Sequence, residues 1–277
     1  MTPNAKSPRR RLAVCVAGVT GAVGRLLTRT ILDQPDLLLT SAVARSACGR
    51  TVGAALNREC NVEIRSSIAD ALAHDRFEVL VDYTSAISAF DNAQIALESG
   101  VHVVVGSSGI THEEFQNLDR IARTHQVGAI HGNFAISAAL AQVFAAGAAR
   151  YLRSWEIVEF AQSDKIDAVS GTARELASRL AESGAPEHSI APDEFVGDSR
   201  SRGATVEGTQ VHALRLPGMT FGFEIIFGRA HERLTIRHEA IARAEPYVDG
   251  TLVAIRNVAR LVGVHRGLES VLELKLQ

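Results

Sequence analysis

One lysine and a nearby Ser-Gly-Thr tripeptide have the residue types needed to hold a small anion. Lys165 lies in a polar loop after an apolar segment that begins at Trp155, and Ser170-Gly171-Thr172 follows at the start of a predicted helix. The free backbone N–H groups and the dipole of a helix N-terminus favour a negative charge. A lysine ammonium adds a charge-assisted hydrogen bond. We therefore predict that Lys165, Ser170, Gly171 and Thr172 bind a carboxylate; the alternative is a plain helix cap beside a solvated lysine.

The residues after the tripeptide predict how this helix begins. Thr172 and Glu175 have the Thr-x-x-Glu spacing of a capping box, which places Ser170 just outside the helix. In that arrangement the hydroxyls of Ser170 and Thr172 and the backbone amides beside them face the anion. Lys165 then balances the charge of the anion.

Three glycines follow the first apolar run of the chain. Residues 12–18 read Leu-Ala-Val-Cys-Val-Ala-Gly, which is typical of a strand buried on both faces of a parallel sheet. The G-x-x-G-x-x-G spacing that follows is a variant of the dinucleotide fingerprint, in which glycines permit the turn, the approach of the pyrophosphate and close helix packing. We favour a cofactor loop over a structural turn. Its predicted contacts are Gly18, Thr20, Gly21, Ala22, Val23 and Gly24.

The end of the second predicted strand, residues 37–44, indicates which cofactor is bound. A site for NAD places Asp or Glu about 20 residues beyond the glycine loop, on the ribose hydroxyls. Ala44-Arg45 stands there instead, and Arg45 could bind a 2′-phosphate. NADPH is the predicted cofactor, with NADH also possible, unless Arg45 is only a surface arginine. A second loop, Gly106-Ser107-Ser108-Gly109, either contacts the nicotinamide end of the cofactor or is a simple turn.

Strand-like and helix-like segments alternate up to Asn133, and this pattern predicts an α/β fold with a Rossmann-type doubly wound parallel sheet. After Asn133 an Ala-rich helix at residues 136–151 precedes four segments of alternating apolar and polar residues. Such alternation favours an open mixed sheet with one covered face. We predict a dinucleotide-binding domain of residues 1–133 and 243–277, and an α+β domain of residues 134–242 for substrate binding and oligomerisation.

The bulk composition excludes several classes of partner. The chain has 277 residues, 46% hydrophobic residues and a formal net charge of −2, so neither nucleic acid nor an anionic membrane is an expected partner. No apolar run approaches the roughly 20 residues of a membrane helix. The three cysteines, at positions 15, 48 and 60, lack metal-ligand spacing. We expect no metal, a small-molecule substrate, and reduced thiols in a cytoplasmic protein.

Short motifs in a fixed order resemble one enzyme family. After the glycine loop come Gly106-Ser107-Ser108-Gly109, Gly132-Asn133-Phe134-Ala135, Ser170-Gly171-Thr172-Ala173, Val-His-Ala-Leu-Arg-Leu at residues 211–216 and Leu-Thr-Ile-Arg-His at residues 234–238. From Leu12 onward the chain resembles the 4-hydroxy-tetrahydrodipicolinate reductase (dihydrodipicolinate reductase) family of lysine and diaminopimelate biosynthesis. The resemblance implies hydride transfer from NADPH to a cyclic unsaturated imine dicarboxylate. It also implies cofactor contacts from Asn133 and Phe134, and a homotetramer joined through the open sheets.

The resemblance breaks where protonation is carried out. The family's loop resembles Glu-x-His-His-x-x-Lys-x-Asp-x-Pro-Ser-Gly-Thr-Ala, but here Ala161 and Gln162 replace the two histidines and Val169 replaces the proline. In the family the first histidine and the lysine are the proposed acids, and the second histidine helps to hold the substrate. By position, the resemblance implies Lys165 as the catalytic residue and Gln162 as a substrate contact. Loss of a positioned acid typically lowers a rate by about 10²–10⁴-fold.

Three hypotheses of function follow from these residues. The first, which we adopt, is the reductase of the lysine pathway, with Lys165 or water as the acid. The second is a divergent paralogue that reduces a related cyclic imine or unsaturated carboxylate in specialised metabolism, with Ala161 enlarging the pocket. The third is an NADP-binding sensor or assembly subunit without catalysis, which would have no need of Lys165 and Ser-Gly-Thr. His131 is a weaker candidate acid, whereas we expect His212 and His238 to have packing roles.

Overall fold

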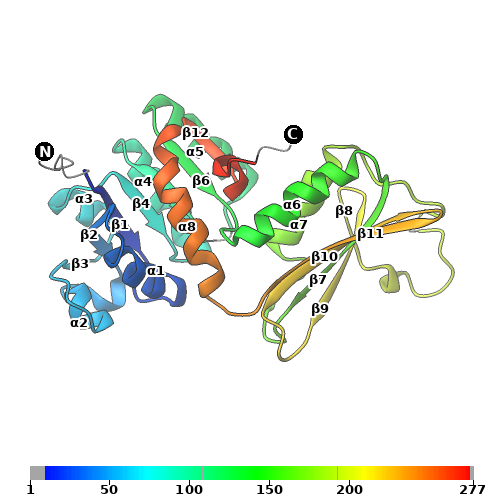
Figure 1. The fold of residues 1–277 in the computed structure, drawn as a ribbon, viewed down its shortest axis with the longest axis horizontal. Coiled ribbons are helices and arrows are strands. Elements are labelled where there is room, and N and C mark those ends of the chain that lie inside the picture. The colour runs from blue at the N-terminus through cyan, green and yellow to red at the C-terminus, as the bar shows by residue number, and fades with distance from the viewer. Residues whose placement is uncertain (1–9, 108, 192, 275–277) are drawn as a thin grey trace, which may run out of the picture. The chain divides into compact units, whose positions relative to one another are not determined.

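The structure, a computed structural model, divides the chain into two compact units (Figure 1). It describes residues 10–107, 109–191 and 193–274. The first unit comprises Met1–Phe134 and Tyr247–Gln277, and the second comprises Ala135–Pro246. The first unit is therefore assembled from both ends of the chain.

The first unit contains a seven-stranded sheet in which every neighbouring pair is parallel, in the order β12-β6-β5-β4-β1-β2-β3. This confirms the predicted Rossmann-type sheet. Side chains on both of its faces are buried, as in a sheet covered by helices on two sides. The strands are β1 (Leu12–Ala17), β2 (Leu37–Val43), β3 (Ile64–Arg65), β4 (Val79–Asp82), β5 (His102–Val105), β6 (Gly128–His131) and β12 (Gly263–Arg266).

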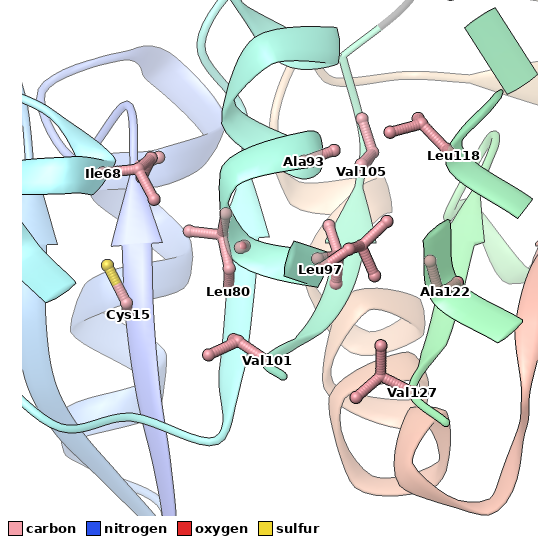
Figure 2. Packing of buried hydrophobic residues seen from close by; sticks show 14 of the residues in the cluster. Cys15, Ile68, Leu80, Ala93, Leu97, Val101, Val105, Leu118, Ala122 and Val127 are labelled. Carbon is pink, nitrogen blue, oxygen red and sulfur yellow. The ribbon is translucent and has the colours of Figure 1, made fainter. Parts of the chain in front are cut away.

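Helices of this unit connect the strands, and three of them form the main apolar core with one face of the sheet. The core cluster joins side chains of the third, fourth and fifth helices to those of the central strands (Figure 2). The fifth helix begins with the predicted capping box of Thr111 and Glu114. The helices are α1 (Ala22–Leu32), α2 (Val52–Leu56), α3 (Ile68–His74), α4 (Ala86–Glu98), α5 (His112–Thr124) and α8 (Glu245–Asn257), with 3₁₀ turns η1 (Arg45–Ala47), η3 (Val258–Arg260) and η4 (Leu268–Val271).

The second unit contains a five-stranded sheet in the order β11-β10-β7-β9-β8. Only β7 and β9 pair in parallel, so the sheet is mixed and open, as predicted. Two helices lie on the same side of it (Figure 1), and most of β11 is exposed. The elements are α6 (Ile136–Ala149), β7 (Ser154–Ala161), α7 (Gly171–Ala181), η2 (Ser199–Arg202), β8 (Ala204–Val206), β9 (Thr209–Arg215), β10 (Phe221–Arg229) and β11 (Glu232–Ala240).

Two parts of the first unit differ from the sequence-based expectation. The sequence of residues 248–262 predicts a single helix, but α8 ends at Asn257 and the chain continues through η3 into β12. This strand has one strongly apolar residue, Val264, and exists because it pairs with β6 and because Asp119 of α5 accepts a hydrogen bond from its backbone at 2.8 Å. The Gly, Ser and Arg residues after Ala44 predict a loop through Gly53, but α2 begins within that range, at Val52. Among the described residues, no helix has the length and apolar character needed to span a membrane.

Leu97 tests the placement of the core. It is fully buried on α4 (Figure 2), whereas Ile87 on the same helix is 90% exposed. Leu97→Ala should lower the free energy of unfolding by about 2–5 kcal/mol, because it leaves a cavity. Ile87→Ala should change that free energy by less than about 0.5 kcal/mol. Urea unfolding followed by circular dichroism measures the free energy of unfolding of both variants. Equal losses of that free energy in the two variants would contradict this packing.

Candidate active site

The glycine loop of the first unit has the shape that a dinucleotide requires. Gly18 has a φ of +83°, and a Cβ atom added there would lie 2.4 Å from the carbonyl oxygen of Tyr83. A Cβ atom on Gly24 would lie 2.1 Å from the carbonyl oxygen of Gly18. The backbone N–H of Gly21 donates to that same carbonyl at 2.9 Å. Larger residues at positions 18 and 24 would therefore push the first turn of α1 away from β1.

The N-terminus of α1 is open to an anion. Gly21 is the N-cap residue, no side chain among the described residues caps the helix, and its first turn carries no acidic residue. The first backbone N–H groups of a helix have no partner within the helix, and its dipole favours negative charge there. This is the position at which Thr20, Gly21, Ala22, Val23 and Gly24 were predicted to hold the pyrophosphate.

Arg45 follows the end of β2 directly, in η1. Its side chain is exposed, and it forms no hydrogen bond or ion pair with the other residues that the structure describes. By contrast Arg65, at the end of the neighbouring β3, pairs with Asp75 through two hydrogen bonds of 3.1 Å. Arg45 is thus the side chain at this end of β2 that is available to a phosphate, and its contact with the cofactor stays a prediction.

Asp82, at the end of β4, organises the second predicted cofactor loop. Its fully buried carboxylate accepts hydrogen bonds from the hydroxyl of Ser107 at 2.9 Å and from the side chain of Asn92 at 2.8 Å. The backbone and hydroxyl of Thr84 donate to it at 2.9 and 2.8 Å. Because the Ser107 hydroxyl donates to Asp82, it cannot also donate to a cofactor. Sequence reasoning missed Asp82, although a carboxylate that ends an apolar strand was a usable signal.

Tyr83 links three parts of the first unit. Its carbonyl oxygen faces Gly18, and its ring lies where a Cβ atom on Gly106 would stand, at 2.2 Å. Its hydroxyl is 2.6 Å from that of Thr251 on α8, and burial raises the pKa of Tyr83. The C-terminal helix is thereby tied to both predicted cofactor loops. No pattern in the sequence indicated this contact, because the two residues lie far apart in the chain.

Several residues around the end of β6 for which cofactor contacts or an acid role were predicted are buried or half-buried. The side chain of Phe134 is fully buried, so a cofactor contact there would have to come from its backbone. Asn133 is half-buried, and Ser108 lies outside the described residues. Burial lowers the pKa of His131 to about 4, and its Nε2 atom is 3.3 Å from the carbonyl oxygen of Ser107. His131 is therefore neutral near pH 7, which argues against the imidazolium acid that we considered.

In the second unit, Ser170 rather than Thr172 caps the helix. The Ser170 hydroxyl accepts a hydrogen bond from the backbone of Ala173 at 3.3 Å, and α7 begins at Gly171. The predicted capping box is wrong because the Ser170 N–H is held by both carboxylate oxygens of Glu159, each at 3.1 Å, which fixes the chain in an extended conformation there. Gly171 is exposed, and a Cβ atom on it would meet nothing within 4 Å. The helix N-terminus thus has room for a ligand.

Glu159 is the centre of a network that shapes the polar loop. It is 1% exposed on β7, and Nη2 of Arg215 donates to it at 2.7 Å. The same Nη2 atom donates to the backbone carbonyl of Asp167 at 2.6 Å. Asp167 in turn accepts a hydrogen bond from Nζ of Lys165 at 2.5 Å. A continuous chain of contacts therefore joins Lys165 to Ser170, which brings the two predicted parts of the anion site onto one scaffold.

The charge of the loop follows from these contacts. Partial burial acts to raise the pKa of Asp167, but the hydrogen bond and charge of Lys165, a backbone hydrogen bond and the charge of Arg215 together outweigh it, so the pKa lies below its usual value. Lys165 is about one-third exposed and is therefore reachable by a ligand. Arg215 was missed as a functional candidate, although its position in the motif at residues 211–216 was a possible signal.

The positions of the two missing histidines lie at the end of β7. Ala161 is buried as the last residue of the strand, and Gln162 follows it. The side-chain oxygen of Gln162 accepts a hydrogen bond from Arg243, a residue that sequence reasoning also missed. The backbone oxygen of Gln162 accepts from Lys165 N–H at 3.1 Å. Neither the methyl group of Ala161 nor the amide group of Gln162 can serve as a general acid.

Two histidines of this unit, His212 and His238, have structural partners, as predicted. Nε2 of His212 is 2.7 Å from the carboxylate of Glu156. Nδ1 of His238 is 3.1 Å from the hydroxyl of Ser137, and its ring packs on Phe223. Among the residues that the structure describes, no group of three His, Cys, Asp or Glu side chains could hold a metal ion.

Comparison with known proteins identifies the chain's relatives. The family model for the N-terminus of dihydrodipicolinate reductase matches residues 12–134, and the model for its C-terminus matches residues 135–272. The chain belongs to the dihydrodipicolinate reductase family. Members of this family are NAD(P)H-dependent oxidoreductases. The open α1 N-terminus lies in the part that matches the N-terminal model, and the Glu159 network lies in the part that matches the C-terminal model.

Individual relatives cover nearly the whole chain. The 4-hydroxy-tetrahydrodipicolinate reductase of Moorella thermoacetica is 40% identical over 269 residues, which is 95% of this chain and 98% of that protein. The enzyme of the same name from Listeria welshimeri is 33% identical over 264 residues, covering 95% and 100%. The solved structure of dipicolinate-bound dihydrodipicolinate reductase from Paenisporosarcina sp. TG-14 has a TM-score of 0.77 and 28% identity, covering 95% and 100%. An amine dehydrogenase from Mycobacterium smegmatis, at 14% identity and a TM-score of 0.68, shares the fold.

Gly24 tests the cofactor loop. The methyl group of Gly24→Ala would lie 2.1 Å from the Gly18 carbonyl oxygen, so the first turn of α1 must move and its amides lose their alignment. We expect the Kd for NADPH, measured by fluorescence titration, to rise about tenfold or more, a loss of about 1.4 kcal/mol. The control is Gly147→Ala on α6, where a Cβ atom meets nothing within 4 Å. It should keep the affinity for NADPH; an unchanged Kd in Gly24→Ala would remove this loop from the cofactor site.

Proposed function

We propose that the protein reduces 4-hydroxy-tetrahydrodipicolinate, a cyclic unsaturated imine dicarboxylate, with hydride from NADPH, in lysine and diaminopimelate biosynthesis. The observation that carries the proposal is the near full-length similarity to enzymes of that name, at 32–40% identity. The anion site of the second unit supports it, because Ser170, Gly171 and Thr172 offer a helix N-terminus and Lys165 offers a cation to a carboxylate. Arg45 supports NADPH over NADH.

The proton must come from a group other than the histidines of the family loop. Ala161 and Gln162 occupy those positions, and neither is an acid. Lys165 is the cationic donor on the loop, and water is the alternative source. We therefore assign Lys165 two roles, the binding of a substrate carboxylate and the delivery of a proton, and Gln162 the role of a neutral substrate contact.

A second candidate function rests on Ala161. A methyl group where the family has an imidazole leaves extra volume at the end of β7, which suits a related but bulkier cyclic imine or unsaturated carboxylate. A catalytically inactive NADP-binding sensor is the third candidate. The retained chain from Lys165 to Ser170 argues against it, because a protein without catalysis has no need of an ordered anion site.

The exposed face of the second sheet supports a homotetramer. It carries Leu214 of β9, and Leu216 directly follows that strand; their side chains are 42% and 49% exposed in the single chain. A second copy of the same sheet would cover them. We also infer a cytoplasmic location, where Cys15, Cys48 and Cys60, which are free here, stay reduced.

The decisive experiment follows NADPH oxidation with 4-hydroxy-tetrahydrodipicolinate generated in situ, and then with a panel of other cyclic imines. Rapid turnover of the first substrate supports the proposed function and excludes the paralogue. Turnover of another imine alone supports the paralogue. Tight NADPH binding without any turnover supports the sensor.

Lys165 tests the source of the proton. Lys165→Ala should lower kcat by about 10²–10⁴-fold if its ammonium is the acid. Lys165→Arg is the matched control, because a guanidinium keeps the cation but does not release a proton near neutral pH. It should restore the KM for substrate without restoring kcat. Steady-state kinetics separate the two parameters, and full kcat in Lys165→Arg would make the residue a binding group only.

Arg45 tests the cofactor preference. Arg45→Ala should raise the Kd for NADPH roughly 10- to 100-fold, the loss of about 1.4–2.8 kcal/mol from an arginine–phosphate contact, and leave the Kd for NADH unchanged. Arg50→Ala is the control, since that exposed guanidinium donates to the carbonyl of Ala54 at 3.1 Å in the same segment. Parallel titrations with both nucleotides give the ratio of the Kd for NADPH to the Kd for NADH in each protein. Equal weakening of NADPH and NADH would exclude recognition of the 2′-phosphate by Arg45.

A further inference from the structure

The guanidinium of Arg215 joins two parts of the second unit that are distant in sequence. In the parallel pair of β7 and β9, Arg215 stands opposite Ala161, and Ala213 opposite Glu159. Side chains two residues apart on a strand point to the same face. Arg215 and Glu159 therefore share the helix-covered face, at the end of the strands where the polar loop begins.

Both terminal nitrogens of Arg215 donate hydrogen bonds to protein acceptors. Nη2 donates to Glu159 at 2.7 Å and to the carbonyl of Asp167 at 2.6 Å. Nη1 donates to the carbonyl of Leu214 at 2.9 Å, and the side chain is 16% exposed. Such a side chain is placed to fix the backbone rather than to receive a ligand directly.

The other end of the loop depends on the same carboxylate. Glu159 accepts the backbone N–H of Ser170 at 3.1 Å from both oxygens. Arg215 and Ser170 thus share Glu159, so that the position of Asp167 and the start of α7 are set together. Because Asp167 binds the ammonium of Lys165 at 2.5 Å, the position of that ammonium relative to the helix N-terminus follows from the same network.

We propose that Arg215 is a positioning residue for substrate binding: through Glu159 and Asp167 it sets the spacing between the Lys165 ammonium and the amides of Gly171 and Thr172, and so the affinity for a small dicarboxylate. The proposal rests on the proposed function and adds to it a residue that positions the substrate-binding groups. It concerns affinity for the carboxylate and not the transfer of hydride, since Arg215 touches neither reacting group in this scheme.

An arginine suits this position because one planar group binds the Glu159 carboxylate and the backbone carbonyls of Asp167 and Leu214. A lysine at this position carries a single compact ammonium and lacks the rigid fork of donors. Removal of Arg215 alone leaves Glu159 buried without its cation, which is strongly destabilising. A double substitution, Glu159→Gln with Arg215→Met, avoids that charge, and the glutamine oxygen can still accept the Ser170 N–H.

The experiment compares the double variant, Arg215→Lys and a control with wild-type protein. The control is Arg153→Met, because Arg153 also anchors a loop of the second unit through backbone carbonyls, those of Ser183 and Ala185, but not the loop at 162–173. Two measurements are made on each protein. Hydrogen–deuterium exchange of residues 162–173 needs no ligand, and calorimetric titration measures the Kd for dipicolinate and for NADPH.

In the double variant we expect faster exchange across residues 162–173 and a Kd for dipicolinate raised roughly 10- to 100-fold, with the Kd for NADPH unchanged. Arg215→Lys should give an intermediate Kd for dipicolinate, and Arg153→Met should bind both ligands as the wild type does. Unchanged exchange in the loop, or faster exchange with wild-type affinity for dipicolinate, would overturn the proposal. A wild-type protein that binds dipicolinate but does not reduce the substrate contradicts the proposed function and leaves this inference intact.

Discussion

The buried carboxylate of Glu159 is the constraint on which the second unit of this protein depends. It lies on the helix-covered face of β7, opposite Phe223 of β10, where an unpaired charge would cost several kcal/mol. The backbone N–H of Ser170 and the guanidinium of Arg215 compensate for that burial. Ser170 ends the polar loop, and Arg215 of β9 also binds the backbone carbonyl of Asp167 within it. The partners that compensate for one buried charge therefore also determine the shape of this loop.

The first unit depends on a comparable buried carboxylate, but with neutral partners. Asp82 ends β4 and accepts hydrogen bonds only from hydroxyl, amide and backbone donors among the described residues. Tyr83 beside it contacts Gly18, Gly106 and Thr251. In each unit, therefore, a buried acid lies at or near the end of a central strand. There it forms hydrogen bonds with loop residues and is not itself exposed to ligand. Such acids act on function through the loops that they order.

The contacts that order the polar loop do not depend on the side chains at the end of β7. The network that joins Lys165 to Ser170 is complete, while Ala161 and Gln162, at the end of β7, carry no acid. The network does not involve the side chains of Ala161 or Gln162, so those positions could change without loss of the order of the loop. Burial also keeps His131, in the first unit, neutral near pH 7.

The sequence alone determined the architecture, most strands and helices and the family, and it singled out the glycine loop and the residues Lys165, Ser170, Gly171 and Thr172, whose roles stay predictions. These follow from local spacing, because periodicity and glycine positions act between near neighbours in the chain. Only the tertiary structure decided that Ser170 caps α7, that β12 forms beside β6, and that Glu159 and Arg215, 56 positions apart, hold the loop between them. Such contacts depend on which strands pair and in what register, and no local pattern in the sequence encodes that choice.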